Sequence, residues 1–131
     1  MKIPLRDAVL DGIALLLPVE CAGCGAPDRG VCATCRPALA PDPTSRLLAD
    51  RTPVFSGLDY EGVARRVLLA YKEQGRTGLS RHLAPALAAA VSEAVSVHGL
   101  RGLEIVSVPG TRRSRRRRGF DPVAALVARA G

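Results

Sequence analysis

The sequence predicts a small ribbon-like module that carries four cysteines, followed by an incomplete α/β domain with a parallel sheet. All four cysteines of the 131-residue chain fall within residues 21–35, as two C-x-x-C pairs. From residue 53 onward, apolar segments of strand and helix type follow in the order β-α-α-β-loop-α, which is typical of α/β domains. The proline-rich segment 36–43 predicts a linker. We therefore assign residues 1–50 to the first part and residues 51–131 to the second.

The first expected element is a short amphipathic helix at residues 5–17, where apolar residues recur at helical spacing until Pro18 ends the pattern. Its apolar stretch is too short to span a bilayer, and Asp7 and Asp11 interrupt it. No small-residue cleavage site follows it, so it does not resemble a secretory signal. We expect a cytoplasmic protein with no membrane span.

The two cysteine pairs predict a metal site. Tight turns at the C-x-x-C pairs bring together the four thiolates that a tetrahedral zinc ion takes in structural sites, with ligands Cys21, Cys24, Cys32 and Cys35. Two alternatives stay open. The cysteines can form two disulfides, although no secretory signal supports an oxidising compartment. They can also hold an iron–sulfur centre. The short spacer with glycine and proline favours structural zinc, which leaves no open position for a substrate.

The second part begins with a strand and two helices. Residues 54–60 alternate in hydrophobicity, as expected for a strand. Apolar residues from Val63 to Tyr71 repeat with helical period, and Lys72 stands in the last turn, where a cation complements the helix dipole. Residues 79–97 predict a longer, alanine-rich helix that stops at Gly99. Residues 44–52, between the linker and the strand, are too weakly patterned to predict an element.

A second strand, a basic loop and a third helix complete the predicted order. The continuous apolar run at 103–108, ended by Pro109, is typical of a buried strand. A loop with six arginines follows it at Arg112–Arg118. Asp121 then makes a good N-cap, with Pro122 at the first helical position. The loop therefore lies between the carboxyl end of a predicted strand and the start of a predicted helix.

The position of the arginine-rich loop favours a role in ligand binding. A run of like charges is usually a solvated surface. In open α/β sheets, however, ligands bind at the carboxyl ends of the strands, and arginines there can hold phosphate in bidentate fashion. The net charge of +7 suits a phosphate-bearing ligand or DNA. Six arginines on DNA phosphates predict a log–log salt slope of about −5. Aromatic residues are only 3% of the chain, which disfavours binding by base stacking.

Several segments, taken in order, resemble one family. They are the double C-x-x-C, Tyr60-Glu61-Gly62 leading to Leu68-Leu69-Ala70-Tyr71-Lys72, Gly75-Arg76, Val106-Ser107-Val108-Pro109 and Arg117-Arg118-Gly119-Phe120. Together they resemble the ComF family, competence-protein-F-like members of the type I phosphoribosyltransferase superfamily that carry an N-terminal double zinc ribbon. The resemblance runs from about residue 5 to residue 131.

The resemblance implies a fold, a function and a set of site residues. The four cysteines fall on the family's zinc ligands, and the second part falls on the start of a phosphoribosyltransferase-like domain with a parallel sheet. The implied phosphate-binding residues are Lys72, Arg115, Arg116, Arg117, Arg118 and Gly119. The implied activity is phosphoribosyl transfer linked to DNA uptake, with competence proteins as partners. Magnesium would accompany phosphoribosyl pyrophosphate in a full-length relative.

The sequence departs from the family in two places. Asp121-Pro122 replaces a polar pair after Gly-Phe, which puts polar side-chain contacts there in doubt. No later apolar strand leads into an acidic pair and a Thr/Gly-rich donor loop. We therefore expect a chain that stops before its donor-binding loop and is inactive alone. The alternatives are a zinc-containing accessory protein that binds nucleic acid through Arg112–Arg118, and a gene product with no activity.

Overall fold

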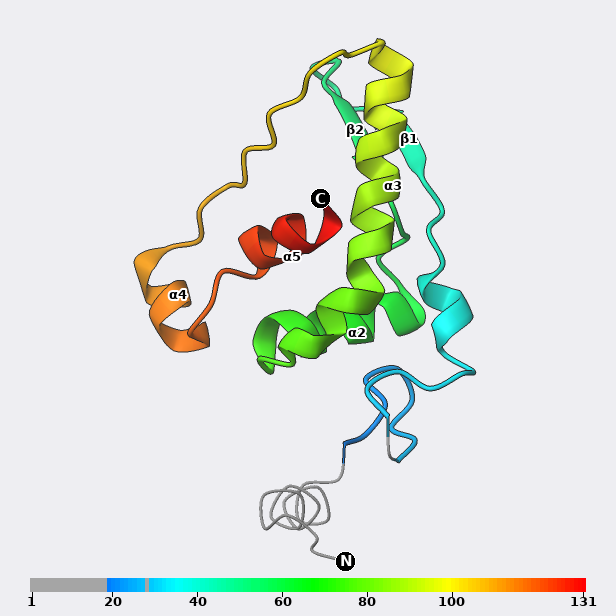
Figure 1. Ribbon diagram of the computed structural model, residues 1–131, viewed down its shortest axis with the longest axis vertical. Coiled ribbons are helices and arrows are strands. Elements are labelled where there is room, and N and C mark those ends of the chain that lie inside the picture. Colours follow the sequence, from blue (N-terminus) through cyan, green and yellow to red (C-terminus); the bar gives the residue numbers. More distant parts are fainter. Residues whose placement is uncertain (1–18, 28) are drawn as a thin grey trace, which may run out of the picture.

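The computed structural model describes residues 19–27 and 29–131, and Figure 1 shows their arrangement. The helix expected at residues 5–17 lies outside the described residues. No helix in the described part is both long enough and apolar enough to cross a membrane. The elements in chain order are the 3₁₀ helix η1 (Arg36–Leu39), strands β1 (Thr44–Leu47) and β2 (Pro53–Ser56), helix α2 (Gly62–Glu73), the 3₁₀ turn η2 (Thr77–Leu79), and helices α3 (Ser80–His98), α4 (Arg112–Arg118) and α5 (Pro122–Ala130).

The sheet of the described part is an antiparallel hairpin. β1 pairs with β2 in a register that runs from Thr44 opposite Ser56 to Leu47 opposite Pro53. The strand expected at 54–60 is therefore confirmed over its first residues only. The sequence did not predict β1, because all four of its residues are exposed and no apolar face marks it.

The predicted parallel sheet is corrected by the structure. Residues 103–108, expected to form a buried strand, belong to no strand. In Figure 1 this segment runs alone between the end of α3 and α4. Val106 and Val108 are 80% and 86% exposed. A strand needs a neighbour to accept and donate its backbone hydrogen bonds, and the described residues place none beside this segment.

The arginine-rich segment is a helix, where a loop was expected. Thr111 caps α4, because its Oγ1 accepts a hydrogen bond from the Ser114 backbone N–H at 3.2 Å. Gly119 ends α4 in the left-handed conformation, with φ of 75°. Arginine has a high helix propensity, and the caps at both ends also favour a helix over a loop here.

The remaining helices agree with the sequence pattern. α2 buries Ala64, Val67, Ala70 and Tyr71, which lie three or four residues apart on one face. α3 ends at Gly99, as predicted, and this glycine adopts the left-handed conformation. Asp121 caps α5 by accepting hydrogen bonds from two backbone N–H groups, and α5 packs against α3.

One hydrophobic core joins the cysteine segment to the helices. Tyr71 is 2% exposed and lies at its centre; its ring meets that of Phe120 edge to face, with 5.6 Å between centroids. The Tyr71 hydroxyl donates a hydrogen bond to the Pro122 carbonyl oxygen at 2.7 Å, which fixes the start of α5 on α2. The buried members of this core are Cys21, Val31, Cys35, Leu39, Ala64, Val67, Ala70, Tyr71, Leu79 and Leu83.

The first prediction concerns the contact between the hairpin and α3. A Cβ at Gly57 would lie 1.9 Å from the Ala86 carbonyl oxygen, whereas a Cβ at Gly102 would meet no atom within 4 Å. Gly57→Ala should therefore lower the free energy of unfolding by ~3 kcal/mol or more, because the α3 backbone cannot yield cheaply. Gly102→Ala is the matched control and should change it little. Urea denaturation measures both; equal stabilities would contradict this packing.

Candidate metal centre and basic cluster

The four predicted cysteines come together in the structure. Their Sγ atoms all lie within 4.8 Å of one another, and those of Cys24 and Cys32 are 3.6 Å apart. A tetrahedral ion with metal–sulfur bonds of about 2.3 Å separates its ligands by about 3.8 Å. Four cysteines at this spacing could therefore hold one tetrahedral metal ion such as zinc.

Backbone hydrogen bonds shape the two turns that carry the sulfurs. The Gly25 N–H donates to the Cys21 carbonyl oxygen at 2.8 Å, and the Cys35 N–H donates to the Cys32 carbonyl oxygen at 3.2 Å. Gly25 has φ of 79°, a conformation that glycine adopts without strain. The Ala22 N–H donates to the Gly30 carbonyl oxygen at 2.9 Å and brings the two turns together.

The sulfurs differ in burial and in acidity. Cys21 and Cys35 are buried, Cys32 is half-buried and Cys24 is exposed. Burial raises the pKa of Cys21, but N–H donors from Cys32, Cys24 and Gly23 outweigh it and bring that pKa to about 6. Burial, together with the neighbouring cysteine side chains, raises the pKa of Cys35 to about 12. Because one thiolate disfavours the next, a cation is needed to make all four sulfurs anionic.

The alternatives to a single ion fit this geometry less well. All four cysteines are free thiols in the structure, and 3.6 Å between Cys24 and Cys32 Sγ is far longer than the ~2.05 Å of a disulfide. A cluster of several iron atoms has to fit between its thiolates and would hold them farther apart than a single ion does.

Arginine side chains from α2 and from the turn after it bind backbone carbonyl oxygens of the cysteine segment. Arg66 Nε donates to the Gly23 carbonyl oxygen at 2.5 Å, and Arg76 Nη2 donates to the Glu20 carbonyl oxygen at 2.6 Å. A Cβ at Gly23 would lie 2.7 Å from Cys35 Sγ and 3.0 Å from Val63, so only glycine fits there. Sequence reasoning missed both arginines, because an arginine that binds a distant carbonyl leaves no local pattern.

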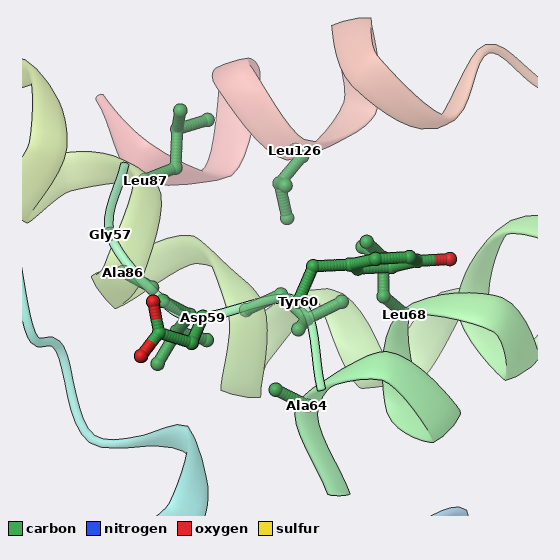
Figure 2. A pocket seen from close by; sticks show the side chains of 10 residues that line it. Gly57, Asp59, Tyr60, Ala64, Leu68, Ala86, Leu87 and Leu126 are labelled. Atoms are coloured by element: carbon green, nitrogen blue, oxygen red, sulfur yellow. The ribbon is translucent and has the colours of Figure 1, made fainter. Parts of the chain in front are cut away.

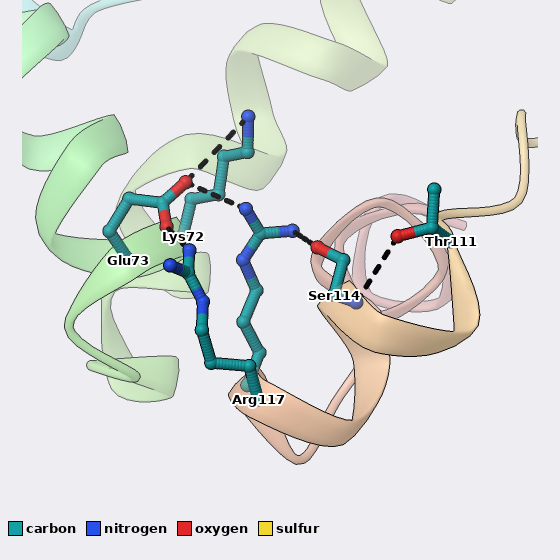
Figure 3. A network of polar contacts seen from close by, with 6 residues as sticks. Lys72, Glu73, Thr111, Ser114 and Arg117 are labelled. Carbon is teal, nitrogen blue, oxygen red and sulfur yellow. Dashed lines mark hydrogen bonds and ion pairs between the residues drawn. The ribbon is translucent and has the colours of Figure 1, made fainter.

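The predicted phosphate-binding residues are only partly gathered. Lys72, Arg117 and Arg118 meet at the end of α2, around the Glu73 carboxylate, and Figure 3 shows this arrangement. Arg115 instead donates to the Gly110 carbonyl oxygen. Arg116 is exposed, and Gly119 is the C-cap of α4. We call Lys72, Arg117 and Arg118 the basic cluster.

Glu73 was not predicted as a member of this site. Arg118 Nη2 lies 2.8 Å from Glu73 Oε1, Arg117 Nη2 lies 2.9 Å from Oε2, and Lys72 Nζ lies 3.9 Å from Oε1. The hydrogen bond from Arg118 lowers the pKa of the Glu73 carboxyl, and the three positive charges lower it further. Only the expected clustering of arginines could have pointed to a nearby carboxylate, and it does not specify which one.

A separate apolar cavity of about 160 Å³ lies where α2, α3 and α5 meet the end of the hairpin (Figure 2). Leu68 of α2, Leu87 of α3 and Leu126 of α5 line it. Asp59 and Tyr60 complete the lining from the segment before α2, and both are exposed. Asp59 is the one charged residue among those that line the cavity, and the leucines make its wall mainly apolar.

Comparison of the chain with protein-family models, with curated proteins and with solved structures finds no match. The function must therefore be argued from the geometry of the cysteine site and of the basic cluster, together with the sequence resemblance.

The second prediction concerns the protons released on metal binding. Since the pKa of Cys21 is about 6, this sulfur is already a thiolate at pH 7.5. Binding one zinc ion at that pH should therefore release fewer than four protons, and affinity should fall as the pH is lowered because protons then compete for the thiolates. Calorimetry in buffers of different ionisation enthalpy counts the protons. Release of all four would show that the pKa of Cys21 is not lowered.

Proposed function

We propose that this chain is a ComF-like protein of the phosphoribosyltransferase family, with one structural zinc ion on its four cysteines and a phosphate-binding site at the basic cluster. The observation that carries the proposal is the cysteine cluster, whose sulfurs lie within 4.8 Å of one another. Its position before the Tyr60–Lys72 segment and the Arg117-Arg118-Gly119-Phe120 segment matches the order of the family's motifs.

The donor set supports zinc in a structural role. Four thiolates in tetrahedral array are typical of structural zinc, and a closed set of protein ligands leaves no place for substrate. Cys21 and Cys35 belong to the hydrophobic core beside Val67 and Leu79. The ion would thus hold together the part of the core that lies between the two cysteine turns and α2. In this role zinc binding contributes directly to folding.

The contacts of Glu73 support phosphate binding by the basic cluster. Two guanidinium groups and one ammonium group already hold a carboxylate there, and phosphate offers the same paired oxygen acceptors with a larger charge. Three cations and one carboxylate leave the cluster with a net charge of +2, which attracts an anion such as phosphate. The ligand proposed is a phosphate-bearing small molecule, such as the pyrophosphate group of a sugar donor.

The proposal is one of binding rather than turnover. In the described residues no strand leads into an acidic pair and a Thr/Gly-rich loop, the segment expected to hold the ribose and 5′-phosphate of the donor. This polypeptide should therefore bind pyrophosphate without consuming phosphoribosyl pyrophosphate. A role in DNA uptake rests on the family resemblance alone.

The exposed arginines of α4 favour a second candidate function, nucleic-acid binding. Arg112, Arg113 and Arg116 are exposed, and none of them pairs with a carboxylate in the part of the chain described. Such a row of free guanidinium groups suits the phosphates of a polyanion.

The third prediction tests the phosphate site. Zinc-loaded chain should bind inorganic pyrophosphate, and Arg117→Gln/Arg118→Gln should weaken binding by roughly tenfold or more, because both charge-assisted hydrogen bonds are lost. Arg112→Gln/Arg113→Gln removes the same charge from the same helix and should retain most of the affinity. Isothermal titration calorimetry measures all three. Equal losses of affinity in the two variants would show that pyrophosphate responds to the overall positive charge of α4 and not to a site at Arg117 and Arg118.

The fourth prediction separates the second candidate. If α4 binds DNA, Arg112→Gln/Arg113→Gln/Arg116→Gln should make the log–log salt slope of affinity shallower by about 3, since each phosphate contact contributes about 0.9. Fluorescence anisotropy with a labelled duplex at several salt concentrations measures this slope. A slope that the triple variant leaves unchanged would remove these three arginines from any DNA-binding surface.

A further inference from the structure

We propose that Glu73 is an internal counter-anion that occupies the phosphate position of the basic cluster and has to move away before a phosphate-bearing ligand binds. This inference rests on the proposed phosphate site and adds a regulator to it. The chemical class of the competing ligand is a phosphate or pyrophosphate anion.

The contacts of the Glu73 carboxylate match those that a phosphate would make. Its two oxygens bind different guanidinium groups, Oε2 with Arg117 at 2.9 Å and Oε1 with Arg118 at 2.8 Å. Lys72 approaches the same Oε1 at 3.9 Å (Figure 3). Two oxygens of one phosphate can accept charge-assisted hydrogen bonds from the same two guanidinium groups. Carboxylate and ligand would therefore compete for the same donors.

The side chains at this site differ in burial and therefore in how freely they can move. The Arg118 side chain is only 16% exposed, and its Nη1 also donates to Ser114 Oγ, so the helix itself holds it in place. Its buried Nε has no acceptor among the described residues. The side chains of Arg117 and Glu73 are 70% and 34% exposed, so both can turn toward solvent without disturbing the core. Glu73 can thus leave while Arg118 stays.

The energies of these contacts allow phosphate to displace the Glu73 carboxylate from the basic cluster. Partly exposed ion pairs contribute little, because water and salt screen them and long side chains lose freedom in forming them. A phosphate dianion gains more from the same three cations than a single carboxylate does. Glu73 would therefore lower the affinity for phosphate without abolishing binding, and would keep the cluster satisfied in the absence of ligand.

A purely structural role for Glu73 makes a different prediction. In that case its contacts serve only to fasten α4 to α2, and removing the charge would loosen α4 and weaken pyrophosphate binding. If Glu73 competes with the ligand, removing its charge should instead strengthen pyrophosphate binding. The direction of the change in affinity distinguishes the two roles.

The experiment compares three zinc-loaded 131-residue chains by calorimetric titration with inorganic pyrophosphate. Glu73→Gln should bind about tenfold more tightly than wild type, because the competing charge is gone. Glu93→Gln, on α3 and without an ion pair in the described part, is the matched control and should change affinity by less than about twofold. Melting curves establish that each variant is folded.

The titrations distinguish three outcomes. Tighter binding by Glu73→Gln alone supports the proposal. Unchanged or weaker binding by Glu73→Gln, with binding still weakened in Arg117→Gln/Arg118→Gln, overturns the role of Glu73 and leaves the phosphate site intact. Absence of binding in both wild type and Glu73→Gln overturns the phosphate site as well.

A second measurement uses the wild-type chain and so does not depend on how Glu73→Gln folds. Carbon-13 NMR follows the Glu73 side-chain carboxyl during a pyrophosphate titration. The signal should move with saturation as the carboxylate leaves Arg118. A carboxyl signal that stays in place while the guanidinium signals of the cluster move would contradict displacement.

Discussion

The convergence of four cysteine sulfurs is the constraint on which the rest of this structure depends. Sulfurs within 4.8 Å of one another cannot all be thiolates without a cation, and two of them are buried in the only large core of the described residues. An ion bound to the sulfurs would hold the two turns in fixed positions, so that Val31, Leu39 and Leu79 can pack against them. Only 3% of the residues are aromatic, so this core is built mainly from leucine, valine and alanine around the cysteines.

Helix α2 extends this constraint to the second site. Near its start, Val63 and Arg66 contact the first cysteine turn at Gly23. At its end, Lys72 and Glu73 meet the arginines of α4. Between them, Tyr71 fixes the start of α5 through its hydroxyl and its contact with Phe120. One helix of 12 residues therefore positions both the cysteine segment and the basic cluster. The buried face of this helix belongs to the core that lies between them.

The sequence predicted what depends on neighbours in the chain and missed what depends on distant ones. The α2 face, the Gly99 cap and the Asp121 cap follow from local spacing, and the cysteine pairs follow from a short motif. Residues 103–108 have a strand-like pattern, but a strand also needs a partner, which no local pattern supplies. The pairing of Glu73 with Arg117 and Arg118 joins residues more than 40 positions apart, so it emerged only in three dimensions.

Amide hydrogen exchange of α2, compared between zinc-loaded and chelated chain, tests the central claim most directly. If a four-thiolate zinc site holds the core together, chelation should release one zinc per chain and raise the exchange rates of Val67 and Ala70 by roughly tenfold or more, because the core on which α2 packs is loosened while the cysteine turns keep their backbone hydrogen bonds. The predicted protection should return when zinc is restored. A chain that carries no zinc as purified, or that keeps full protection of α2 after its zinc is removed, would contradict the account.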